Sequence, residues 1–133
     1  MSDRSELIEL HNRLSKTLDE ERVVAREKRY EKGYRTAREN LDDLVDKDSF
    51  VEYGQLAIAA QKSRRELEEL RTETAADGII TGFGKINSEI LDDKKALSAI
   101  IINDYSVLAG THGYYHHKKL DRNCETAAKQ NLP

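Results

Sequence analysis

The sequence of 133 residues has no tryptophan, only two phenylalanines and one cysteine, Cys124. A single cysteine cannot form a disulfide within the chain, so cysteine usage favours a reducing, cytoplasmic location. Apolar runs such as 56–60 and 99–102 are far shorter than the roughly 20 residues that a membrane-spanning helix needs. The first ten residues also lack the apolar segment and cleavage site of a secretory signal. We therefore expect no membrane partner.

An excess of positive charge is also missing. The formal net charge is −3, whereas a nucleic-acid-binding domain usually carries a basic face and a high pI, so we expect no nucleic-acid partner. Charged residues are nevertheless abundant, at 35% against 38% hydrophobic residues. This balance predicts long solvated helices around a modest core, in a chain long enough for one domain.

Periodic leucines indicate that residues 5–32 are helical. Four leucines recur at spacings of three and four residues and would share one stripe of a helix: Leu7, Leu10, Leu14 and Leu18. Asp19 is expected to cap a second helix, whose last turn is rich in basic residues that suit the helix dipole. Gly33 then fits the position just past the end of that helix, where a left-handed conformation is common.

A capping-box pattern follows in the stretch TAREN. The Thr36 hydroxyl can accept the backbone N–H of Glu39, while the Glu39 carboxylate can accept the N–H of Thr36. The pattern predicts a short helix from Ala37 to about Val45. Residues 50–53, beyond a polar turn, have the composition of a short strand.

The second half contains the main strand signals. Residues 61–74 are so highly charged that we expect a solvated helix with an i,i+4 ladder of arginine and glutamate. Strands are predicted at 78–87, where Gly82 suggests a close approach by another backbone or a ligand, and at 97–110. The polar stretch 92–95 would be the tip of a hairpin between them. A final helix should run to about Gln130, and the fold should be incomplete after it.

Three of the four histidines lie in residues 104–122 and raise the question of a metal site. His112 and His116 could share a helix face, but no third ligand stands at a suitable spacing, and Lys118 and Lys119 place positive charge nearby. Histidines on a wet helix surface explain the pattern more simply. We therefore assign no metal.

The glycines of residues 110–113 suggest an anion site at the start of the final helix. Glycine lets backbone N–H groups turn outward there, and free N–H groups together with the helix dipole favour phosphate or carboxylate. An ordinary strand-to-helix turn explains the same glycines and is the more frequent case. No Gly-x-Ser-x-Gly motif is present, and acidic neighbours disfavour a thiolate at Cys124, which is better interpreted as a structural cysteine.

Four segments in order carry a family resemblance: RTARENLDDLVDKDSFVEYGQLAIAAQ, ADGIITGFGKIN, AIIINDYSVLAGTHG and HHKKLDR. Together they resemble the start of the carboxyltransferase component of biotin-dependent acyl-CoA carboxylases of the acetyl-/propionyl-CoA carboxylase type. The likeness is strongest to the branch in which all components share one chain. It divides the sequence into an N-terminal helical segment, 1–34, and the N-terminal part of a carboxyltransferase domain, 35–133.

The resemblance implies an α/β fold, α+β by the order of its elements. N-terminal helices would precede the first part of a crotonase/ClpP-like fold of βαβ units. It also implies transfer of a carboxyl group from carboxybiotin to the α-carbon of an acyl-CoA. Biotin would be held on a separate carrier domain, with a biotin carboxylase domain and further copies of the complete protein as partners.

In such enzymes, backbone N–H groups of glycine-rich turns stabilise the enolate and ureido oxygens. The resemblance places those turns beyond Pro133, so we assign no catalytic residue and expect this chain alone to be inactive. The residues expected to border acyl-CoA are Gly110, Thr111, His112 and Gly113, and Arg35 and Arg38 are expected to contribute to CoA binding or to packing.

The following segment, 114–122, would then be a polar helix face, partly turned toward a CoA phosphate or a second subunit. A function of another class stays open at this point. The chain could be a non-enzymatic helical interaction or assembly module, in which residues 5–32 form an amphipathic hairpin that binds a partner.

Overall fold

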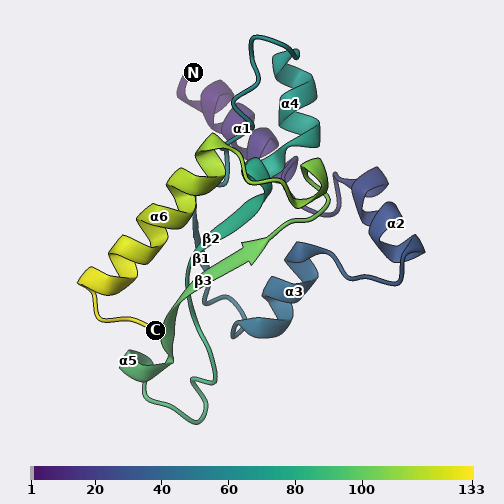
Figure 1. The fold of residues 1–133 in the computed structure, drawn as a ribbon. Helices are drawn as coiled ribbons and strands as arrows, with labels where there is room; N and C mark the ends of the chain where they lie inside the picture. The colour runs from purple at the N-terminus through teal and green to yellow at the C-terminus, as the bar shows by residue number, and fades with distance from the viewer. Residues whose placement is uncertain (1) are drawn as a thin grey trace.

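The computed structural model describes residues 2–133, with side chains from residue 4 onward. The helices are α1 (Ser2–Ser15), α2 (Val23–Glu31), α3 (Ala37–Leu44), α4 (Leu67–Glu73), α5 (Asp93–Ala96) and α6 (Tyr114–Lys129), with short 3₁₀ helices η1 (Ala75–Gly78) and η2 (Leu108–Gly110). The strands are β1 (Val51–Tyr53), β2 (Ile79–Lys85) and β3 (Leu97–Asn103). Figure 1 shows α6 and α3 on either side of the small sheet. This mixture of helices and strands agrees with the fold class expected from the sequence.

The sheet has the order β1-β2-β3, and both neighbouring pairs are antiparallel. The hairpin between β2 and β3 is confirmed, with α5 at its tip. The third strand is shorter than the predicted 97–110, because it ends at Asn103. No parallel βαβ unit is formed within the described residues. After α6 the chain returns to the start of β3, where the Ala99 N–H donates to the Pro133 carbonyl at 2.7 Å.

A small apolar core lies between α3 and the sheet. Leu41 and Ala37 from the helix pack against Ile80 and Ile100 from the central and third strands. Gly82 lies under this layer, where an added Cβ would come within 2.1 Å of the Val51 carbonyl oxygen. The predicted close approach at this glycine is therefore confirmed, and the approaching group is the backbone of β1.

The N-terminal helices differ from the expectation in one respect. Residues 2–31 form two helices, but the N-cap position of α2 is Arg22, and no side chain caps this helix. Asp19 is thus not the cap, and its carboxylate instead accepts a hydrogen bond from the Thr36 hydroxyl. The end of α2 is as predicted, because Gly33 has a φ of +74° and Tyr34 N–H donates to the Arg29 carbonyl.

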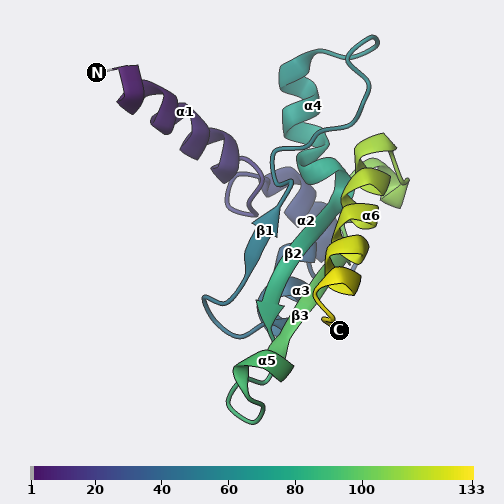
Figure 2. The ribbon, with the colours of Figure 1, turned by 90° about the vertical axis from the view of Figure 1, so that its left-hand side faces the viewer.

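The predicted leucine stripe of the first helix lies largely in solvent. Leu7 is 51% exposed and Leu10 is 41% exposed, and Figure 2 shows α1 projecting away from the rest of the molecule. The charged stretch 61–74 is helical only from Leu67 to Glu73. Of its predicted i,i+4 ladder the Arg65–Glu69 ion pair is present, and Arg65 also pairs with Glu73, eight residues away. Among the described residues, no helix has the length and apolar character needed to cross a membrane.

Candidate functional site

The start of α6, where the glycines suggested either an anion site or an ordinary strand-to-helix turn, is occupied by a carboxylate of the same chain. Asp77, which is 1% exposed, accepts the backbone N–H of His116 at 2.9 Å. An added Cβ on Gly113 would lie 3.2 Å from both Asp77 carboxylate oxygens. Burial raises the pKa of Asp77 above its usual value, although its contacts with α6 oppose this shift. The Asp77 side chain therefore caps α6, because Gly113 at the N-cap position has no side chain that could do so.

Asp77 sits in a turn of unusual backbone conformation. Ala76, Asp77 and Gly78 have φ values of 54°, 48° and 74°, and a left-handed conformation is unfavourable for the first two because they carry a Cβ. Lys119 reaches this turn from α6, and its ammonium donates to the carbonyls of Ala76, at 2.7 Å, and Ile79. Contacts from α6 thus hold the turn in place.

Two residues expected on a polar helix face are in fact buried. Lys119 is 9% exposed and His116 is 1% exposed, because one side of α6 packs against η1 and the sheet. Burial lowers the pKa of Lys119 to about 8, and it also lowers the pKa of His116. The expectation of a solvent-exposed helix face therefore holds only for the residues of α6 that point away from the sheet, such as Tyr114 and His117.

The His116 ring is held by hydrogen bonding and by stacking. Its Nδ1 lies 3.1 Å from the Asp77 carbonyl oxygen, which can only accept, so the neutral ring carries its proton on Nδ1. The ring stacks on His112, with centroids 4.1 Å apart. In the described part of the chain, no group of three or more His, Cys, Asp or Glu residues is placed to hold a metal ion.

The turn before α6 brings its predicted residues together at the surface. Gly110 has a φ of +80°, and its α-carbon packs on the Tyr105 ring, where an added Cβ would come within 2.9 Å. The side chains of Thr111 and His112 are exposed. Residues 110–113 thus offer two side chains to an external ligand, while the N–H of His116 is already bonded.

The two predicted arginines have different environments. Arg38 forms a two-bond ion pair with Glu52, at 2.7 and 3.0 Å, and both side chains are nearly buried. Arg38 therefore serves packing by joining α3 to β1. Arg35 is exposed and pairs with Asp43 at 3.1 Å. Within the described residues, neither arginine forms a hydrogen bond or ion pair with residues 110–113.

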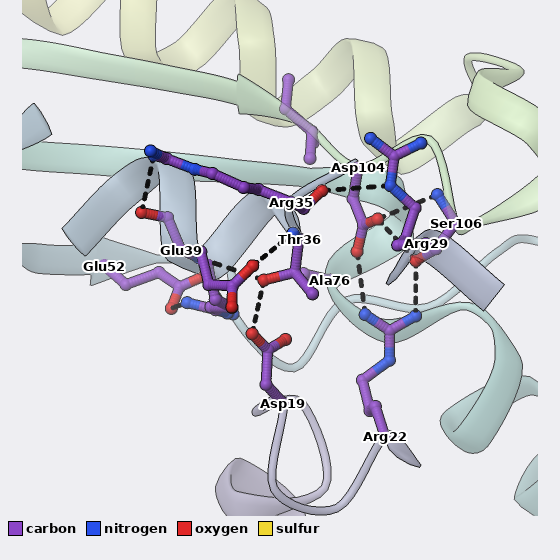
Figure 3. A network of polar contacts seen from close by, with 12 residues as sticks. Asp19, Arg22, Arg29, Arg35, Thr36, Glu39, Glu52, Ala76, Asp104 and Ser106 are labelled. Atoms are coloured by element: carbon purple, nitrogen blue, oxygen red, sulfur yellow. Dashed lines mark hydrogen bonds and ion pairs between the residues drawn. The ribbon is translucent and has the colours of Figure 1, made fainter. Parts of the chain in front are cut away.

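A buried ion pair near this turn was not predicted. Arg22 donates to the Asp104 carboxylate at 2.8 Å and to the Ser106 hydroxyl at 3.1 Å, as Figure 3 shows. Burial alone would raise the pKa of Asp104, but Arg22 and Ser106 outweigh burial and hold this pKa below its usual value. The Asp-x-Ser spacing of Asp104 and Ser106 is a local signal for the contact between these two side chains. Their partner Arg22 lies 82 residues from Asp104 in the sequence.

A cavity of about 590 Å³ opens beside this ion pair. Residues of α2 and its two ends form one wall, and residues 105–109 together with the end of α4 form the other. The first wall is basic, because Lys28, Arg29 and Lys32 line it along with Arg22. The basic cluster of residues 26–32 was a sequence signal for this cavity. The same cluster is explained equally well by a favourable interaction with the helix dipole.

Cys124 lies on α6 and is exposed as a free thiol. The interpretation of this residue as a structural cysteine is therefore wrong, because its exposed side chain points away from the face of α6 that packs on the sheet. The neighbouring Asn123 occupies the buried position and donates to the Ile100 carbonyl at 3.0 Å.

Comparison with known proteins gives consistent matches over most of the chain. The model of the family described as "Carboxyl transferase domain" matches residues 28–133. The beta5 subunit of a biotin-dependent acetyl-/propionyl-coenzyme A carboxylase from Mycobacterium leprae (strain TN) is 34% identical over 128 residues, which cover 96% of this chain and 21% of the relative. The chain thus spans about a fifth of the length of this curated relative.

Solved structures also match. A single-chain, multi-domain long-chain acyl-CoA carboxylase superposes with a TM-score of 0.94 and 48% identity, over 96% of this chain and 13% of that chain. Transcarboxylase 12S, described as a hexamer with methylmalonyl-coenzyme A bound, matches with a TM-score of 0.63 and 28% identity, over 82% of this chain and 19% of that chain.

Proposed function

This chain belongs to the carboxyl transferase domain family, and from that premise we propose that it forms the N-terminal part of a biotin-dependent acyl-CoA carboxyltransferase. The complete enzyme would move a carboxyl group from carboxybiotin to the α-carbon of an acyl-CoA. The observation that supports this proposal most strongly is the TM-score of 0.94 with a long-chain acyl-CoA carboxylase, at 48% identity. This match covers 96% of the chain.

Within that enzyme, residues 110–113 would border the acyl-CoA. Because the N–H of His116 is bonded to Asp77, the proposed contacts come from the exposed side chains of Thr111 and His112. Arg35 is a further candidate because its guanidinium is on the surface. Arg38 is better explained by packing, since its ion pair with Glu52 is nearly buried.

Biotin would come to the complete enzyme on a separate carrier domain, and when carboxylated it supplies the activated carboxyl group. Its ureido group would need free backbone N–H donors of the kind that glycine-rich turns supply, and we assign no such turn to the described residues. At the start of α6 the His116 N–H donates to Asp77 instead. This chain would therefore contribute scaffold and acyl-CoA contacts, and no step of the transfer is assigned to it.

The same proposal includes the partners and the location of the complete protein. A biotin carrier, a biotin carboxylase domain and further copies of the carboxyltransferase would be its partners. The hexamer assembly of transcarboxylase 12S supports the last of these. A cytoplasmic location is supported by the single free thiol of Cys124.

A second role for the N-terminal segment is favoured by one observation. Leu7, Ile8 and Leu10 of α1 are 51%, 59% and 41% exposed, and an exposed apolar helix face is typical of a binding surface. An interaction role for α1 is compatible with the enzymatic proposal, because it uses residues outside the turn that would border acyl-CoA.

The proposal is tested by a chimera. The matching segment of the single-chain long-chain acyl-CoA carboxylase is replaced by this chain, and acyl-CoA-dependent fixation of labelled bicarbonate is measured. We expect turnover, because fold and packing agree over the replaced segment. Loss of bicarbonate fixation in a folded chimera that still carboxylates its own biotin would contradict the proposal, since that result isolates the defect to the carboxyltransferase.

A further inference from the structure

We propose that His116 is an acid-sensitive switch for the turn that precedes α6, residues 110–113. While the His116 ring is neutral, it fits between the Asp77 carbonyl and the His112 ring. When the ring takes up a second proton, the stack with His112 opens and the turn is released. The switch is a property of this chain alone, whereas its consequence for acyl-CoA rests on the proposed function.

The His116 ring lies in a closed space at the start of α6. The residue is 1% exposed, as is the neighbouring Val107. An added Cβ on Gly78 would lie 3.7 Å from the ring Nδ1 and 3.3 Å from the Val107 side chain. His112 covers one face of the ring, with centroids 4.1 Å apart and planes inclined by 16°. The ring therefore cannot reach water unless the turn moves.

The second ring nitrogen makes this arrangement sensitive to acid. Because Nδ1–H donates to the Asp77 carbonyl at 3.1 Å, a proton taken up by the neutral ring must bind to Nε2. In the described part of the chain, Nε2 of His116 is buried and has no hydrogen-bond partner. A neutral nitrogen there loses only one acceptor contact, whereas a protonated one would bury a charged donor without an acceptor, which costs far more. Protonation therefore favours the open turn.

The charges around the ring do not cancel this effect. Within the described residues, the titratable groups that face His116 are Asp77 from η1, His112 from the turn and His117 from α6. Burial is the largest influence and lowers the pKa of His116 below its ordinary value of 6.5. The two histidines lower it further, and Asp77 opposes them. Lys119 also faces Asp77 and competes for its charge.

The direction of the pKa shift gives the direction of the switch. In the open turn the His116 ring is in water and has its ordinary pKa, so below about pH 6.5 the open turn binds the proton more readily than the closed turn. Acid therefore favours the open turn, and the closed turn is favoured above this pH. Burial raises the pKa of Asp77, so titration of Asp77 stabilises the folded arrangement as pH falls and cannot produce the opening.

Opening of the stack would free the side chain of His112. The backbone bonds of Gly110 and Thr111 are local, because each N–H donates to a carbonyl three residues earlier. The stack, in contrast, joins the turn to the ring of His116, which is bonded to η1. The residues that the proposed function places beside acyl-CoA therefore depend on this ring for a fixed position.

Hydrogen exchange followed by mass spectrometry on the 133-residue chain tests the switch without any substrate. We define the acid response as the rise in exchange rate of residues 107–117, corrected for the intrinsic rate, from about pH 7 to pH 5. It should be at least about threefold, since uptake of one proton can change an opening equilibrium by up to about tenfold per pH unit. Peptides from β2, residues 79–85, are the internal reference and should show no such rise.

Two variants that cannot titrate separate the proton from the shape of the ring. His116→Asn keeps a donor for the Asp77 carbonyl, and His116→Phe keeps a flat ring against His112. Both should lose the acid response, whatever their stability. The matched control is His117→Asn, the next residue on α6, which should keep the response.

Three results would overturn the switch. One is a parent protein without an acid response. Another is a response in His116→Phe or His116→Asn as large as in the parent, because neither side chain can take up the proton. The third is loss of the response in His117→Asn, which would assign the effect to the exposed histidine.

The consequence for acyl-CoA is measured in the chimeric carboxylase. From about pH 7 to pH 5.5 its KM for acyl-CoA should rise at least about twofold more than in the chimera with His116→Asn, within the limit set by uptake of one proton. Equal KM profiles in two active chimeras would overturn this consequence. An inactive chimera, beside an intact acid response in the 133-residue chain, would reject the proposed function and leave the switch supported.

Discussion

Thr36 connects two segments that are separate in the sequence. Its hydroxyl accepts the N–H of Glu39 at 3.1 Å, and its own N–H donates to the Glu39 carboxylate at 2.8 Å. The same hydroxyl donates to Asp19, in the turn between α1 and α2. One side chain therefore both starts α3 and attaches the N-terminal helices to it.

We expect Thr36→Ala to lower the free energy of unfolding by about 0.5–2 kcal/mol, the usual cost of losing a helix cap. Urea denaturation followed by circular dichroism measures this change. Thr36→Ser keeps the hydroxyl and is the matched control, which should stay close to the parent protein. An equal loss of stability in both variants would show that the methyl group matters and the hydrogen bonds do not.

Lys119 makes stability depend on pH in an alkaline window. Its pKa is about 8 in the folded protein and 10.5 is its ordinary value, so between these values the unfolded chain binds more protons. The contribution of this residue to stability therefore rises with pH from about 8 to 10.5. Below pH 8 the cost of burying the ammonium is fully present. The neutral amine still has two hydrogens for its two carbonyl partners.

The measurement is the difference in unfolding free energy between the parent and Lys119→Met at several pH values. The parent should gain stability relative to the variant as pH rises from about 8 to 10, because titration of the exposed lysines and tyrosines cancels in the comparison. A difference that is flat with pH would mean that Lys119 is charged in the folded protein throughout this range.

At the scale of elements, α6 depends on a residue outside the helix. Gly113 at its N-cap position has no side chain to bond the first N–H groups, and Asp77 from η1 supplies the missing acceptor. The interaction runs in both directions, since Lys119 of α6 binds the carbonyls around Asp77. The helix and the turn therefore stabilise each other.

Asp77→Ala should lower the free energy of unfolding by about 1–3 kcal/mol, because buried N–H groups would be left without an acceptor. Asp77→Asn should restore part of this loss, since the amide oxygen can still accept the His116 N–H. Asp121→Ala is the control on the exposed side of α6, with an expected effect within about 0.5 kcal/mol. Equal effects at the two aspartates would contradict the capping role of Asp77.

At the scale of the whole molecule, the proposed function gives this chain acyl-CoA contacts but assigns it none of the oxyanion donors that the transfer needs. We expect no detectable carboxylation when the purified chain is incubated with carboxybiotin and short acyl-CoAs and the products are weighed by mass spectrometry. The reason is that loss of even one oxyanion donor lowers the rate by about 10²–10³. The active chimera serves as the positive control. Turnover near the chimera's rate would instead place the chemistry in residues 110–113.

Helix ends and strand positions were predictable wherever their cause is local. The capping box at Thr36, the left-handed Gly33 and the hairpin between β2 and β3 all follow from residues within a few positions of one another. Asp19 shows the limit of this reasoning. It has the right residue type and spacing for a helix cap, but its carboxylate accepts a hydrogen bond from the hydroxyl of Thr36, 17 residues away.

The residues alone predict where most elements lie and, through four motifs in order, the family to which the chain belongs. Which polar groups are buried, and with what partners, depends on how the elements pack together. The N–H groups that begin α6 would donate to an external phosphate or to an internal carboxylate equally well, because both are anions of suitable size. Packing of η1 against α6 brings Asp77 there from 39 residues away, and no local pattern encodes that distance. The basic cavity beside Arg22 depends in the same way on Asp104, which lies 82 residues along the chain.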